Sequence, residues 1–146
     1  MNRPLILALG IFLCTLGVAS AQSCFGLWKT IDDRTGKPKA LVEIYEENGR
    51  MYGRVEEILE EGREGAVCEN CEGEKKNKPI EGMQIIQGLE PDGEGEWSGS
   101  TIFDPEKAMT FRCKIWLDPE DPDKLKVRGY MAFLYRTQTW VRAEYN

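Results

Sequence analysis

Apolar and polar residues alternate with a period of two along most of the chain after residue 21. This period places successive side chains on opposite faces of a β-strand, and no stretch shows the 3.6-residue period of an amphipathic helix. The pattern predicts about eight strands. Their expected bounds are Phe25–Ile31, Lys39–Glu47, Arg50–Leu59, Gly82–Leu89, Glu96–Phe103, Ala108–Leu117, Leu125–Leu134 and Arg136–Tyr145.

Turn residues separate these strands, and most connections are short. Asn48-Gly49 is the clearest hairpin signal, because a type I′ turn needs a positive φ at both central positions. A parallel sheet would need intervening helices, for which the chain leaves no room. We therefore expect an all-β fold, a single antiparallel up-and-down β-barrel over residues 22–146. The polar, Gly-rich segment Glu60–Glu81 is expected to be a long surface loop.

The first 21 residues have the composition of a secretory signal peptide. Arg3 precedes an apolar run from Leu5 to Val18, and Ala19-Ser20-Ala21 supplies small residues for cleavage. The run is shorter than the roughly 20 residues that cross a bilayer. We expect cleavage after Ala21, a secreted barrel, and no membrane span after cleavage.

Charge and composition narrow the classes of function. The chain has 19 Lys and Arg, 25 Asp and Glu and no His, for a net charge of −6. This acidity argues against a nucleic-acid partner, which would need a basic face. The absence of His removes Ser-His catalysis and His-ligated zinc. Asp104 and Glu43 are carboxylates that no spacing marks as a catalytic pair, so we expect no enzymatic activity, no metal and no cofactor.

Four cysteines follow the predicted cleavage site: Cys24, Cys68, Cys71 and Cys113. An even number in a secreted chain favours disulfides, although Cys68-x-x-Cys71 also fits a redox pair or half a zinc site. Acidic neighbours such as Glu69 and Glu72 disfavour the reactive thiolate that redox chemistry needs. The favoured pairing is Cys68–Cys71, within the long loop, with Cys24–Cys113 tying the chain start to a later strand.

The expected first and last strands carry residues suited to closing one end of a barrel. Gly26-x-Trp28 opens the first strand, and Arg136 and Trp140 lie in the last. Because these strands are neighbours in a closed barrel, an arginine can stack on a tryptophan there. This combination resembles the Gly-x-Trp and arginine signature of lipocalin and avidin barrels. We predict that Trp28, Arg136 and Trp140 lie together at one barrel end.

A longer resemblance covers almost all of the chain after residue 21. It rests on Gly26-Leu27-Trp28, Val42-Glu43-Ile44-Tyr45, Ile102-Phe103-Asp104-Pro105, Leu125-Lys126-Val127-Arg128-Gly129-Tyr130 and Arg136-Thr137-Gln138-Thr139-Trp140. These blocks are similar to those of a family of small secreted bacterial proteins, the domain of unknown function DUF2147. The resemblance implies a lipocalin-like barrel in the periplasm or at the cell surface, with no established activity.

Two functional hypotheses follow. In the first, the barrel binds a small apolar or amphipathic molecule of the bacterial envelope, since eight strands leave room for packed side chains or one small ligand. The candidate ligand-binding residues are Trp97, Arg128, Tyr130 and Gln138; these same side chains could instead fill a dry core. In the second, the protein is an interaction module for an envelope protein, acting through Glu60–Glu81 and the acidic loop Asp118–Asp123.

Overall fold

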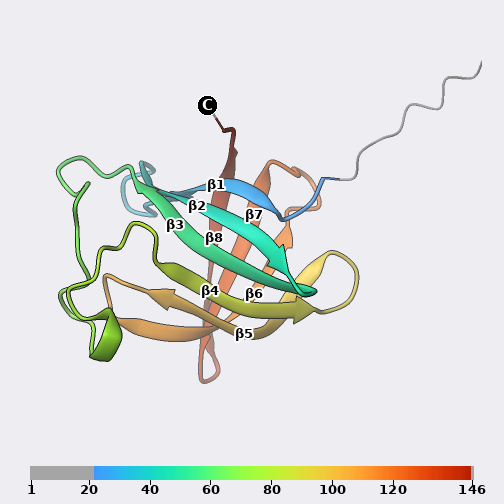
Figure 1. Ribbon diagram of the computed structural model, residues 1–146. Helices are drawn as coiled ribbons and strands as arrows, with labels where there is room; N and C mark the ends of the chain where they lie inside the picture. Colours follow the sequence, from blue (N-terminus) through green and yellow to red (C-terminus); the bar gives the residue numbers. More distant parts are fainter. Residues whose placement is uncertain (1–21, 146) are drawn as a thin grey trace, which may run out of the picture.

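Eight strands form one closed antiparallel barrel (Figure 1). The structure is a computed structural model that describes residues 22–145, so the predicted signal peptide, residues 1–21, lies outside the described residues. The expected all-β barrel is confirmed. The strands are β1 (Gly26–Ile31), β2 (Pro38–Glu47), β3 (Arg50–Ile58), β4 (Gln84–Pro91), β5 (Glu96–Asp104), β6 (Met109–Leu117), β7 (Lys124–Met131) and β8 (Leu134–Ala143).

The barrel closes through the first and last strands, as the sequence predicted. Each strand pairs with the next in chain order, and β1 also pairs with β8. In the closing pair Trp28 lies opposite Arg142. Closure leaves no strand of the barrel, within residues 22–145, with an unpaired edge exposed for pairing with another chain.

The β2–β3 and β7–β8 hairpins show which turns could be predicted from the sequence. Asn48 and Gly49 have φ values of 53° and 77°, as the predicted type I′ turn requires. The last hairpin differs from the prediction, because β7 ends at Met131 and β8 begins at Leu134. Ala132 takes a φ of 53° in that turn. No Gly, Asn or Asp marks the position, so the predicted boundary near Tyr135 was wrong.

Alternate side chains of each strand form the barrel core. Trp28, Val42, Ile44, Ile115 and Leu125 are buried on the inward face. The intervening residues, such as Lys114 and Lys126, carry charge to the outer face. One face of each strand is apolar because that face packs in the core. Burial of each large apolar side chain there stabilises the fold by about 1.5–3 kcal/mol.

The segment between β3 and β4 is a loop, as expected, but much of it is ordered against the barrel. Val67 and Pro79 form an isolated bridge, and a 3-10 helix spans Gly73–Lys75. The predicted Cys68–Cys71 disulfide is present. Ile80 and both half-cystines are buried, so the loop contributes to the core as well as to the surface.

The predicted Cys24–Cys113 disulfide is absent, and both cysteines are buried free thiols. The backbone of Leu117 lies close enough to the Cys24 sulfur to affect the pKa of its thiol. Leu117 lies four residues beyond Cys113 on β6, about 13 Å along an extended strand. A disulfide needs Cα atoms within about 7 Å. Burial raises the pKa of Cys24 to about 11 and that of Cys113 to about 12.

Candidate ligand-binding cavity

A cavity of about 260 Å³ opens at one end of the barrel. Four connections surround that end: the β1–β2 loop, the β3–β4 loop, the β5–β6 turn and the β7–β8 turn. The cavity is slightly smaller than typical pockets for drug-sized ligands, which begin near roughly 300 Å³. It therefore suits one small molecule, or the apolar part of a larger one.

The inner walls of the cavity are mostly apolar. Each of the eight strands contributes an aliphatic or aromatic residue to the lining, and the β3–β4 loop adds another. Gln138 is a polar exception, and its Oε1 accepts a hydrogen bond from Trp140 Nε1 at 3.2 Å. The apolar lining residues are Ile31, Ala40, Val42, Val55, Ile58, Ile80, Ile85, Ile102, Phe103, Pro105, Phe111, Val127 and Trp140.

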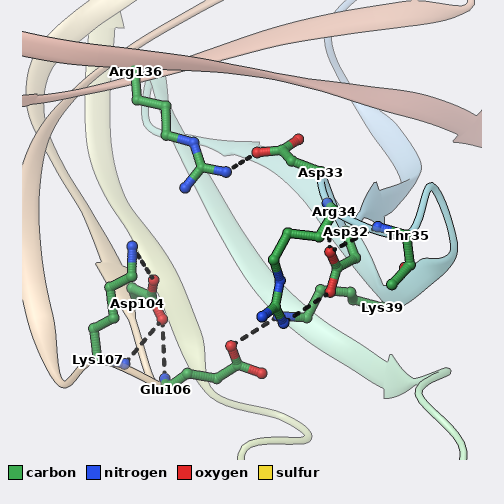
Figure 2. Close-up of polar contacts among 9 residues, drawn as sticks. All are labelled: Asp32, Asp33, Arg34, Thr35, Lys39, Asp104, Glu106, Lys107 and Arg136. Atoms are coloured by element: carbon green, nitrogen blue, oxygen red, sulfur yellow. Dashed lines mark hydrogen bonds and ion pairs between the residues drawn. The ribbon is translucent and has the colours of Figure 1, made fainter.

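Charged side chains surround the mouth (Figure 2). Lys39 Nζ lies 2.8 Å from Glu106 Oε2, and Arg136 on β8 pairs with Asp33 in the β1–β2 loop beside it. The Arg136 and Asp33 side chains are 59% and 42% exposed. A pair this exposed contributes about 0–1 kcal/mol, so another anion can replace Asp33 at little cost.

Two aspartates hold the rim loops in shape. Asp104 Oδ1 accepts the backbone amides of Glu106 at 3.0 Å and Lys107 at 3.2 Å, which fixes the β5–β6 turn. Asp32 accepts the amide of Arg34 at 2.8 Å, and this bond is the main reason its pKa is lowered. Backbone hydrogen bonds to these two aspartates therefore anchor the rim (Figure 2).

The opposite end of the barrel is closed by Trp28 and Arg142. Arg142 Cζ lies 4.2 Å from the Trp28 ring centroid, and Nη2 donates to the carbonyls of Ser23 at 2.9 Å and Pro122 at 3.0 Å. Its Nε is 3.3 Å from Asp123 Oδ1 without hydrogen-bond alignment, so that contact is coulombic. Trp28 Nε1 donates to the Cys24 carbonyl at 2.8 Å.

The prediction that Arg136 stacks at this end is therefore wrong. Arg142 lies opposite Trp28, and Arg136 is six residues earlier on β8, about 20 Å along the strand. Both arginines face inward because their separation is even. Period-two alternation cannot distinguish them; only the β1–β8 register does. Trp140, the third member of the predicted group, lines the cavity.

The candidate ligand-binding residues separate into three places. Gln138 lines the cavity. Trp97 packs edge-on against Phe25, with ring centroids 5.3 Å apart, and does not line it. Arg128 and Tyr130 alternate with inward Val127 and Gly129, so they lie on the outer wall. The prediction that those two residues line the cavity is wrong.

Sequence reasoning missed the cavity residues that come from connections. Arg63 and Ile80 lie in the β3–β4 loop, and Glu106 and Lys107 in the β5–β6 turn. Alternation identifies strand faces but carries no information about where a long loop packs. The apolar residues Val67 and Ile80 within a mostly polar segment were the available signal. Among residues 22–145, no group of three or more His, Cys, Asp and Glu side chains could hold a metal ion.

Comparison with known proteins places the chain in a family. The sequence profile of a family described as an uncharacterized protein conserved in bacteria, DUF2147, matches residues 26–142. The chain belongs to this family. The match runs from the first residue of β1 to near the end of β8, so the whole barrel is the family's domain. No curated protein matches the chain.

A solved structure has a similar fold. It is protein HP1028 from the human pathogen Helicobacter pylori, described as belonging to the lipocalin family. The TM-score is 0.72, the sequence identity is 16%, and the similarity covers 85% of each chain. At this identity the likeness establishes the lipocalin-like fold of this DUF2147 member and nothing about its ligand. Within the described part of the chain, no helix has the length and apolar character to span a membrane.

Proposed function

We propose that the protein binds one small amphipathic molecule, with the apolar part in the cavity and an anionic group at the mouth. The observation that carries this proposal is the contrast between an apolar wall and a charged rim. An apolar ligand part gains about 25 cal/mol per Å² of surface removed from water. Arg136 is the rim cation best suited to the head group, because it faces inward and its present partner is an exposed carboxylate.

The proposal includes a place of action and a type of activity. The protein acts as a binding protein rather than an enzyme, in the bacterial periplasm or at the cell surface. The Cys68–Cys71 disulfide supports an oxidising compartment, because disulfides persist there and are rare in the cytosol. The signal-peptide composition of residues 1–21 supports the same location.

A fluorescence assay tests binding in the cavity. Trp140 lines the cavity, so entry of 1-anilinonaphthalene-8-sulfonate, an apolar fluorophore with an anionic group, is expected to change tryptophan emission and raise probe fluorescence. Ala40→Phe adds a ring to the wall and should abolish this response. Leu41→Phe is the matched control, because Leu41 is the next residue on β2 and points to the opposite face.

A second variant tests the head group. Arg136→Gln should weaken the anionic probe about fivefold or more and leave an uncharged analogue, N-phenyl-1-naphthylamine, unaffected. Equal binding by Ala40→Phe and Leu41→Phe would exclude the cavity as the site. Native mass spectrometry of protein isolated from its own cells should show a bound small molecule; a protein partner in its place would favour an interaction module.

A further inference from the structure

The turn between β7 and β8 exposes apolar side chains to solvent. Phe133 is 90% exposed, Leu134 64% and Met131 45%. Figure 1 shows this hairpin projecting past the neighbouring strands at the bottom of the view. Exposing three adjacent large apolar side chains at a projecting tip is unfavourable in water, and such patches mark interaction sites.

All charged residues in the three strands at this tip are basic, although the net charge of the protein is −6. β6, β7 and β8 carry two, three and two Lys or Arg residues, and none of the three strands contains Asp or Glu. Carboxylates of neighbouring segments pair with three of the outward cations: Glu96 with Lys114, Asp121 with Lys124 and Asp118 with Lys126. The two arginines closest to the tip, Arg112 and Arg128, form no salt bridge with a described residue and lie beside tyrosine rings instead. The outer wall directly behind the tip is therefore a local positive surface.

Side chains are ordered by polarity along the hairpin. Directly behind the apolar tip, Tyr130 and Tyr135 face each other across the strands, with ring centroids 5.9 Å apart. Behind them, Arg128 Cζ lies 4.3 Å from the Tyr135 ring and Arg112 Cζ 5.5 Å from the Tyr130 ring.

Arg112 also braces the tip, because its Nη2 donates to the Ala132 carbonyl at 2.9 Å. The hairpin thus changes from apolar to aromatic to cationic over a few residues.

We propose that the β7–β8 hairpin docks this protein on a phospholipid bilayer with anionic head groups. The order of side chains matches the layers of a bilayer surface. Phe133 and Leu134 enter the acyl region, the two tyrosines lie at the interface, where aromatic residues are favoured, and Arg112 and Arg128 meet the phosphates. Proteins that bind at a membrane interface commonly insert apolar side chains at the boundary between head groups and acyl chains, with basic residues beside them.

A bilayer explains the surface better than a protein or nucleic acid does. A strand-face protein site would spread apolar residues along the wall, whereas here the most exposed ones, Phe133 and Leu134, lie at the tip. Single-stranded nucleic acid would use the outer aromatics and cations and would leave Phe133 without a role.

Docking would also bring the cavity mouth to the membrane, since Gly129 and Arg136, next to the tip, line the cavity. The inference stands without the proposed ligand, because it uses the outer wall.

Vesicle co-sedimentation tests the proposal. The wild-type protein is expected to bind phosphatidylglycerol vesicles more tightly than phosphatidylcholine vesicles. Phe133→Ser should reduce binding about tenfold or more, because it removes a fully inserted side chain. Arg128→Gln should reduce binding to phosphatidylglycerol about fivefold and leave binding to phosphatidylcholine unchanged, and added salt should remove that difference.

The controls use matched residues away from the tip. Val141→Ser removes an exposed apolar side chain from β8, far from the tip. Arg50→Gln removes an exposed cation from the β2–β3 hairpin. Both should bind vesicles as the wild type does. All variants keep the same N-terminus, so any contribution of residues 1–21 is common to them.

Three results would overturn the inference. One is equal vesicle binding by Phe133→Ser and Val141→Ser. Another is a dimer in sedimentation velocity that Phe133→Ser dissociates, with no vesicle binding. The third is tighter binding to a single-stranded oligonucleotide than to vesicles. Phe133→Ser should keep its response to the cavity probe, so failure here is distinguishable from failure of the proposed function.

Discussion

Replacement of Arg142 by Met is expected to be among the most damaging single changes at the closed end of the barrel. Met keeps the apolar stem but removes the guanidinium, which makes two short hydrogen bonds to backbone carbonyls and stacks on Trp28. Hydrogen bonds to charged groups contribute about 1.5–3 kcal/mol each and a cation–π contact about 0.5–2 kcal/mol. The Arg142 side chain is 22% exposed, which favours the lower ends of these ranges.

The expected loss is therefore about 3 kcal/mol in the free energy of unfolding. Urea denaturation followed by tryptophan fluorescence measures it, and the midpoint should fall by about 1–3 M. Arg136→Met is the matched control: the same substitution on the same strand face breaks only an exposed pair and should cost less than about 1 kcal/mol. Equal losses for the two variants, or a loss below about 1 kcal/mol for Arg142→Met, would refute the assignment of the closing role to Arg142.

Three further outcomes follow from the packing. Cys24 and Cys113 should react with Ellman's reagent only after unfolding, since both are buried free thiols. If the unfolded, unreduced protein showed no reactive thiol, the two cysteines would form the disulfide predicted from the sequence. Because burial raises their folded pKa values to about 11 and 12, the unfolded thiols lose protons first, so stability is complete below about pH 9 and falls as pH rises toward 11–12. A flat stability profile there would contradict the burial argument. Gly53→Ala should destabilise by about 1–3 kcal/mol in urea denaturation, because the new Cβ would lie 2.7 Å from Ile86 Cδ1, whereas Gly65→Ala, with open space around it, should be neutral.

The alternation of apolar and polar residues, together with the turn residues, was enough to predict most of the fold. Strand faces follow from a period of two, which local sequence displays directly, and Asn48-Gly49 needs its positive φ values whatever surrounds it. The Cys68–Cys71 disulfide could also be predicted from local sequence, because residues three apart are close in many conformations. The turn at Ala132 could not, because only the pairing of Met131 with Leu134 imposes its conformation.

By itself, the sequence determined an eight-stranded antiparallel barrel, because burial of one strand face and short polar turns are local properties of the chain. Tertiary structure alone decided which arginine meets Trp28, that Cys24 and Cys113 stay apart, and which side chains face the cavity. Those outcomes depend on the register between strands and on where a long loop packs. Both are set by pairing across the barrel between residues far apart in sequence, which no local pattern records.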